Sequence, residues 1–292
     1  MKKATKKGTS TVSLPKLSIP AVWGGVGGTF LIACAVALST DHLFTFFSLG
    51  GLMIVIGGVM AVAFMSFGAK DINEALLAIR NMFREPPTTH ANMYHDIKDI
   101  LAWARIVKEK GMRGLELSMD RTGIDDPFVK FGLTMVVSDY TPEEIRAMME
   151  TAADAYYERD SAPAQVLQAM ASHAPAFGMV GTLIGMVTML YNLSDNPTGI
   201  GPALAVSFLS TLYGVVTARM VYMPAAAKLT QKLDSLRFRN QLITEGMVML
   251  ASNKTSIYIQ DRLNSFLSPE IHDSLAMVLH DRAVLQLKEF RL

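Results

Sequence analysis

Four long stretches without charge constrain the fold of this chain more than any other feature. The sequence has no Asp, Glu, Lys or Arg at 17–40, 42–69, 161–194 or 196–218. Each stretch is longer than the roughly 20 apolar residues that a helix needs to cross a bilayer. Charged residues make up 18% of the chain, against about 25% in ordinary soluble domains. The pattern predicts an all-α, polytopic membrane protein with four transmembrane helices.

The distribution of basic residues indicates how these helices are oriented. Of the 27 Lys and Arg residues, five precede the first stretch, twelve lie between Lys70 and Arg159, and nine follow Met223. The two short loops near Asp41 and Ser194 contain none. Because basic loops are retained in the cytoplasm, both termini and the segment between helices two and three are expected to be cytoplasmic.

The chain is therefore expected to have five parts. The Lys-rich N-terminal tail is expected to be flexible and to touch anionic lipid. The parts are the cytoplasmic tail (1–18), transmembrane helices one and two (19–68), a helical cytoplasmic domain (69–165), transmembrane helices three and four (166–223), and C-terminal cytoplasmic helices (224–292).

Local signals place further helix boundaries. Thr141, followed by Pro142 and two glutamates, is a strong helix start, and nothing ends that helix before Pro163, which is expected to kink rather than stop it. The third transmembrane helix is thus expected to top a long cytoplasmic helix. The paired glycines at 50–51 and 57–58 predict close helix contact. Other expected helices are 19–38, 43–67, 71–83, 92–110 (ended by Gly111), 115–121, 126–137, 225–250 and one from Ser268; no strand pattern is found.

Hydroxyl and small residues follow one face of each of the last two membrane helices. Ser207, Ser210, Thr211 and Gly214 have the spacing i, i+3, i+4 and i+7, which is one helix face. Gly178, Gly181, Thr182 and Gly185 repeat the pattern in the third helix. Such stripes either pack helices together or line an ion route, and spacing alone leaves both open. Neither helix contains a carboxylate, so a titrating group for an ion route would have to come from another polypeptide.

Signatures of soluble enzymes are missing from the sequence. There is no phosphate-binding loop, no H-E-x-x-H motif, and only one cysteine, Cys34, which lies within the first uncharged stretch. His173 is the only titratable group near the third helix. A net charge of +1 gives no reason to expect nucleic-acid binding. We expect neither an enzyme nor a bound cofactor, apart from a transported ion.

Three stretches carry a resemblance to a known family. They are APAFGMVGTLIGMV at 174–187, NLSDNPTGIGPA at 192–203, and TLYG at 211–214. Together they resemble the flagellar motor stator A subunits, the MotA/PomA family of the MotA/TolQ/ExbB superfamily, and look closest to the PomA branch, over roughly residues 20–265.

This resemblance implies a specific assembly in the bacterial inner membrane. Five copies would surround a dimer of a MotB/PomB-type subunit, which has one transmembrane span, an essential Asp and a peptidoglycan-binding domain. Ion flow would turn the ring against that dimer and push the rotor protein FliG.

The resemblance also assigns roles to individual residues. Thr182 and Thr211 match two family threonines, and proton-driven members often lack hydroxyls at these positions. Because oxygen ligands suit hard cations, Na⁺ is the favoured ion and H⁺ is the alternative. Lys108 stands where the family has an arginine, and Ser48 where it often has an Asp. The implied roles are the ion route (Thr182, Thr211, Ser210, Ser207, Tyr213), conformational hinges (Pro175, Pro224) and rotor contact (Lys108, Arg113, Glu116).

Two alternatives stay open on the sequence. The first is an energiser of envelope transport like ExbB or TolQ, although those proteins have three spans in a different order. The second is a membrane scaffold without an ion path, in which the hydroxyl stripes only pack.

Overall fold

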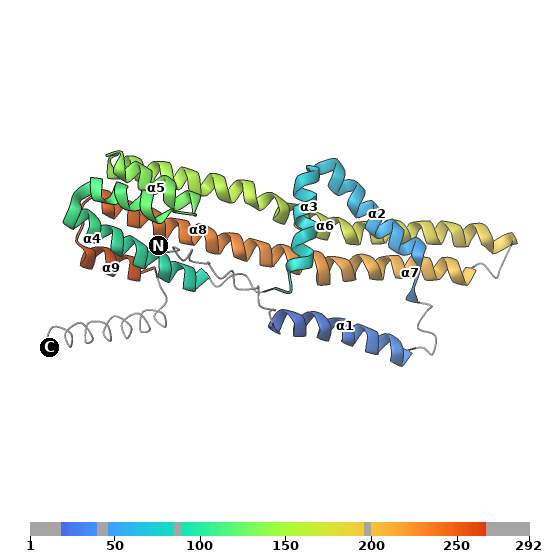
Figure 1. The fold of residues 1–292 in the computed structure, drawn as a ribbon. Helices are drawn as coiled ribbons and strands as arrows, with labels where there is room; N and C mark the ends of the chain where they lie inside the picture. The colour runs from blue at the N-terminus through green and yellow to red at the C-terminus, as the bar shows by residue number, and fades with distance from the viewer. Residues whose placement is uncertain (1–18, 40–45, 85–88, 196–199, 267–292) are drawn as a thin grey trace, which may run out of the picture. The chain divides into compact units, whose positions relative to one another are not determined.

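The regular structure of the chain is helical throughout the residues that the computed structural model describes, namely 19–39, 46–84, 89–195 and 200–266. This confirms the all-α prediction; the tail 1–18 and the helix expected from Ser268 lie outside the described residues. The helices are α1 (Ile19–Ser39), α2 (Leu49–Ser66), α3 (Ala69–Asn81), α4 (Thr89–Thr122), α5 (Pro127–Val137), α6 (Pro142–Asp195), α7 (Ile200–Thr217), a π-helical turn (Ala218–Tyr222), α8 (Met223–Ala251) and α9 (Ser256–Asn264) (Figure 1).

Four helices are long and apolar enough to cross a membrane, as the sequence predicts: α1, α2, α6 and the helix that begins with α7. The predicted start of the second one is wrong, because α2 begins at Leu49 and not near Leu43. Ser48 has an extended backbone, and its side chain accepts a hydrogen bond from the N–H of Gly51, so it is the N-cap and the helix cannot extend back through it. α6 runs through Pro163 without ending, as expected.

The chain divides into two compact units, each with its own buried apolar cluster. The first unit comprises residues 1–87 and 161–232, and the second comprises 88–160 and 233–292. α6 and α8 are each divided between the units, with one part in the first unit and the other part in the second. The paired threonines lie in the first unit, and the charged residues predicted to contact the rotor lie in the second.

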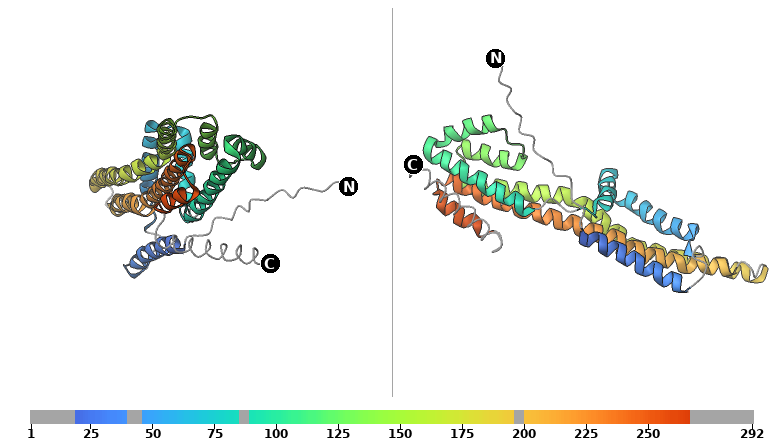
Figure 2. Two further views of the ribbon diagram at one scale, coloured as in Figure 1. Left: turned by 90° about the vertical axis from the view of Figure 1, so that its left-hand side faces the viewer. Right: turned by 60° about the horizontal axis from the view of Figure 1, so that its bottom comes forward.

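The core of the first unit is built mostly from small and β-branched side chains. Val55, Val59 and Ala63 of α2 are spaced by four residues and share a buried cluster with Ala174 and Ala218. α2 lies beside α7, and the two helices make direct contact (Figure 2). In lipid the hydrophobic effect does not drive helices together, so small side chains stabilise helix contacts by letting the backbones approach closely.

Only one glycine of each predicted pair makes the expected close contact. A Cβ added to Gly51 would lie 2.8 Å from the hydroxyl oxygen of Ser210, and one added to Gly58 would overlap the ring of Phe177. A Cβ at Gly50 or Gly57 would meet nothing within 4 Å. The sequence could not distinguish the members of each pair, because both lack a side chain.

Replacing Gly58 with alanine should destabilise the first unit, whereas the same change at Gly57 should not. The whole Phe177 ring would have to move, and overpacking of this kind costs about 1–3 kcal/mol. At Gly57 the new methyl group has room, and alanine favours helix. Thermal unfolding of the purified protein in detergent measures both effects, and equal stability of the two variants would contradict this packing.

Helix boundaries in the second unit follow local capping signals. Thr141 and Glu144 form a reciprocal cap at the start of α6: the Glu144 N–H donates to the Thr141 hydroxyl (3.3 Å), and the Thr141 N–H donates to the Glu144 carboxylate (2.9 Å). Gly111, with φ +68°, interrupts α4 as predicted. α9 is not predicted by the sequence reading, although Thr255 caps it by accepting from the N–H of Tyr258 (3.4 Å).

The fourth apolar helix continues through Pro224, where the sequence predicts the boundary between the membrane helix and the C-terminal helices. α7 leads directly into the π-helical turn and then into α8, which contains Pro224. The N–H of Met223 donates to the carbonyl of Ala218, five residues earlier. Because proline has no N–H to continue the regular ladder, the wider turn immediately before it keeps the helical path continuous.

Candidate functional site

The two threonines singled out by the sequence lie against each other. The hydroxyl oxygens of Thr182 in α6 and Thr211 in α7 are 2.6 Å apart, within hydrogen-bonding distance. Both hydroxyls also approach the carbonyl oxygen of Gly178, at 3.0 Å from Thr182 and 3.4 Å from Thr211. Thr182 is half-buried and Thr211 is exposed. The result is a small group of oxygen atoms on the surface of two apolar helices.

The two serines of the same stripe are buried between the helices. Ser207 is 1% exposed, and its hydroxyl donates to the carbonyl of Thr182 (2.8 Å). Ser210 is fully buried and donates to the carbonyl of Val206 in its own helix (2.7 Å). The stripe that the sequence presents as one face therefore has a packed part, formed by the serines, and an accessible edge at Thr211.

Glycines bring α6 and α7 close enough for the threonines to meet. A Cβ on Gly214 would lie 2.6 Å from the carbonyl oxygen of Ala174, and one on Gly178 would lie 3.0 Å from that of Ser210. A Cβ on Gly185 would lie 2.7 Å from the Cβ of Ser207 and 2.8 Å from the carbonyl oxygen of Ala203. Any side chain at these positions would push the two backbones apart.

The hydroxyl of Tyr213 bonds to the chain just before α2 and not to the paired threonines. It donates to the carbonyl of Phe46 (2.5 Å) and accepts from the N–H of Ser48 (2.8 Å). Pro175 is half-buried inside α6, next to the Ala174 carbonyl that Gly214 approaches. Proline provides no N–H at this point, so the hydrogen-bond ladder of α6 is interrupted where α7 comes nearest.

The residues predicted to contact the rotor lie in the second unit on α4. Lys108, Arg113 and Glu116 are all exposed, and they flank the break at Gly111. None of them takes part in an ion pair within the described part of the chain. Their charges are therefore available to another molecule.

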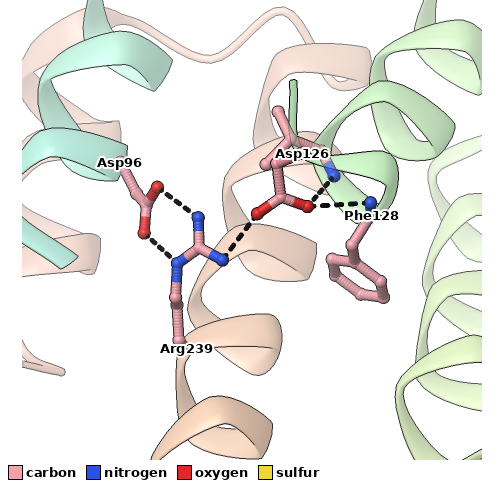
Figure 3. A network of polar contacts seen from close by, with 5 residues as sticks. Asp96, Asp126, Phe128 and Arg239 are labelled. Carbon is pink, nitrogen blue, oxygen red and sulfur yellow. Dashed lines mark hydrogen bonds and ion pairs between the residues drawn. The ribbon is translucent and has the colours of Figure 1, made fainter. Parts of the chain in front are cut away.

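Sequence reasoning missed a network of ion pairs in the second unit. The Arg239 guanidinium of α8 binds both carboxylate oxygens of Asp96 in α4 (2.6 and 2.7 Å) and one oxygen of Asp126 (2.6 Å) (Figure 3). Asp126 also caps α5 by accepting from the N–H groups of Phe128 (2.9 Å) and Val129 (3.4 Å). The network joins α4, α5 and α8. Only the cap had a sequence signal, namely an Asp before Pro127, because more than 100 residues separate Arg239 from its partners.

The surroundings of Asp126 lower its pKa. Burial opposes ionisation, but the hydrogen bond and charge of Arg239, together with the N–H donors of Phe128 and Val129, outweigh it and hold the pKa below its usual value. The pKa of Arg239 is raised, mainly by its hydrogen bond to Asp96. Asp126 therefore stabilises the fold as a carboxylate.

Replacing Asp126 with asparagine should remove a pH-dependent part of the stability. A carboxyl with a lowered folded pKa contributes stability above its unfolded pKa of about 3.9 and loses it as the pH falls through the lower folded value. Asparagine still caps a helix, so only the charge is lost. In thermal unfolding between neutral and strongly acidic pH, the difference between wild type and D126N should be largest at neutral pH and shrink on acidification. A difference independent of pH would contradict this assignment.

The described residues offer oxygen donors but no resident metal site. In that part of the chain, no group of three or more His, Cys, Asp or Glu side chains is arranged to hold a metal ion. The paired threonines supply two hydroxyls and a nearby carbonyl, none of which titrates near neutral pH. Such a group can guide or coordinate a cation but cannot by itself carry a proton.

Comparison with known proteins identifies relatives over most of the chain. The model of the MotA/TolQ/ExbB proton channel family matches residues 120–241. Motility protein A of Aquifex aeolicus is 33% identical over 210 residues, covering 72% of this chain and 81% of that protein. The uncharacterized protein YtxD of Bacillus subtilis is 32% identical over 249 residues, covering 85% and 89%. Chemotaxis protein PomA of Vibrio alginolyticus is 27% identical over 256 residues, covering 86% and 96%, so these identities do not single out the PomA branch.

The fold has solved counterparts as well. A chain of the flagellar MotAB stator complex from Bacillus subtilis matches with a TM-score of 0.74 and 25% identity, covering 87% of this chain and 97% of that one. The family model describes channels and not enzymes, in agreement with the sequence prediction. Since a relative above 30% identity is matched over most of its length, the chain belongs to the MotA/TolQ/ExbB proton channel family.

Proposed function

We propose that this protein is the A-type subunit of a bacterial flagellar stator, which couples ion flow through the inner membrane to torque. The observation that carries the proposal is the hydroxyl pair of Thr182 and Thr211, which lies on the parts of α6 and α7 that contain no carboxylate (161–194 and 200–217). Relatives named motility protein A and the MotAB neighbours support it. The partner would be a MotB/PomB-type subunit whose single span supplies the missing Asp and whose outer domain binds peptidoglycan.

Sodium is the ion that we favour, in the manner of the PomA branch. A cation in hydrocarbon needs its hydration replaced and its charge compensated. The threonine hydroxyls and the carbonyl of Gly178 are hard oxygen donors that can replace water, and the partner's Asp would compensate the charge. One elementary charge crossing 100 mV releases about 2.3 kcal/mol, which is enough to drive a step between neighbouring sites.

Conversion of that step into rotation would use the rest of the fold. We propose a ring of five copies around the partner dimer, with both termini in the cytoplasm. Pro175 and Pro224 interrupt the helical ladder in the two polypeptide paths that carry Thr182 and Thr211, both toward the expected cytoplasmic side, and suit hinges. The unpaired charges of Lys108, Arg113 and Glu116 suit contact with the rotor protein FliG.

Complementation of a motile bacterium that lacks all its stator genes tests the proposal. The chain would be produced together with a B-type subunit encoded beside its gene, and rotation of tethered cells would be scored. We expect rotation with both subunits and none with either alone. Absence of rotation, together with restored growth of a strain that lacks its own ExbB/TolQ-type energisers on a substrate whose uptake needs an energised outer-membrane transporter, would favour the ExbB/TolQ-like alternative. No ion-dependent activity of either kind would favour a scaffold.

A further inference from the structure

The backbone just before α2 leaves the helical conformation beside the middle of α7. Phe46 to Ser48 precede the helix, and Gly51 in its first turn packs against Ser210. Ser210 is ten residues into α7, or about 15 Å from its start at 1.5 Å per residue. Non-helical backbone at such a depth needs protein or water partners for its polar groups, because lipid provides none.

Tyr213 satisfies two of these backbone groups with one hydroxyl. It donates to the carbonyl of Phe46 and accepts from the N–H of Ser48. These bonds join residues 165 or more positions apart in sequence. With its single O–H donor used on Phe46 and its ring half-buried, Tyr213 is engaged with α2 and not with the threonines.

The start of α2 is mechanically linked to the threonine pair. Ser210 lies between Gly51 of α2 and Gly181 of α6, both of which would clash with it if they carried a side chain. Gly181 precedes Thr182, and Ser210 precedes Thr211. A shift of α2 along α7 would therefore press on or release the contact that sets the distance between the two hydroxyls.

We infer that Tyr213 positions the ion route without lining it. Its hydroxyl fixes where α2 begins, and α2 in turn holds Ser210 against α6, beside the two threonines. The inference rests on the proposed stator function for its consequence, since it concerns the geometry of the proposed ion site. Tyr213 would then not be a ligand of the ion; it would affect the ion site through its bonds to the start of α2.

The test compares Y213F with Y222F in rotating motors. Both remove one phenolic hydroxyl from the same helical path, but the hydroxyl of Tyr222, at the end of a side chain that is 7% exposed as a whole, makes no hydrogen bond within the described residues. The speed of tethered cells would be measured against the concentration of the driving ion at fixed membrane potential. We expect Y213F to need a several-fold higher ion concentration for half-maximal speed while keeping its membrane level and near-normal speed at saturation. Y222F should match wild type.

A labelling experiment reports on the same contact without any need for rotation. Phe47, whose side chain is 68% exposed, would be replaced in the variant F47C, with C34S to remove the native thiol. Membranes containing this variant would be treated with a water-soluble maleimide. We expect faster labelling with Y213F than with native Tyr213 or Y222F. Unchanged labelling and ion dependence in Y213F would overturn the inference, as would loss of Y213F from the membrane, which would assign Tyr213 to folding. Failure of the wild type to rotate would refute the proposed function, and labelling would still decide whether Tyr213 holds this segment.

Discussion

Replacing Thr211 with valine should abolish or severely weaken rotation while the protein stays folded in the membrane. Valine has nearly the same shape as threonine but lacks the oxygen that lies 2.6 Å from the Thr182 hydroxyl. Leaving a polar group without its partner costs about 1–3 kcal/mol, which is roughly 5- to 150-fold in ion affinity at about 1.4 kcal/mol per tenfold. Rotation speed against ion concentration in tethered cells measures the effect.

Two further variants control for packing. T211S keeps the hydroxyl and should retain rotation at a modestly altered ion requirement. T188V makes the same change on α6 at an exposed threonine whose hydroxyl bonds only to the carbonyl of Ile184 in its own helix (2.9 Å), and it should behave as wild type. If T211V and T188V rotate equally well, the hydroxyl pair has no part in ion transfer.

Replacing Arg239 with alanine should destabilise the second unit by about 2–4 kcal/mol, because it leaves two carboxylates without their cation. The side chains of Arg239 and Asp96 are only 16% and 12% exposed, so solvent cannot fully replace the lost bonds. We expect a lower thermal midpoint for the purified protein, and a loss of rotation that follows the amount of folded protein.

Arg237 provides the matched control, two residues earlier on α8. It pairs with Asp154, but both side chains are largely exposed, at 43% and 64%, and pairs of this kind contribute under about 1 kcal/mol. R237A should therefore leave the thermal midpoint nearly unchanged. A loss of stability in R237A as large as in R239A would show that the network in Figure 3 has no special role.

Features encoded over short distances in the chain could be predicted from the sequence. The four membrane helices follow from uninterrupted apolar runs, and the start of α6 follows from Thr141, Pro142 and the acidic residues after them. The break in α4 at Gly111 could be predicted from that glycine alone. The spacing of the two stripes places Thr182 and Thr211 each on the small-residue face of its helix, and the structure brings the two hydroxyls together.

Features set by contacts between distant segments could not be predicted. The chain just before α2 is bound by the hydroxyl of Tyr213, which accepts from the N–H of Ser48, 165 positions away in sequence. The Arg239 network joins residues whose separation in sequence gives no periodic signal. Likewise, burial of Ser207 and Ser210 beside the accessible Thr211 depends on the angle at which α6 faces α7.

A sodium titration of single motors tests the central claim most directly. The strain would rely on this protein and its B-type partner alone, with pH and membrane potential held fixed. If the paired threonines form a sodium route in a stator, speed should rise with sodium and saturate, and T211V should shift or abolish that curve. Rotation that is indifferent to sodium and stops when the proton gradient is collapsed would contradict the sodium assignment, and motors that never turn would contradict the stator function itself.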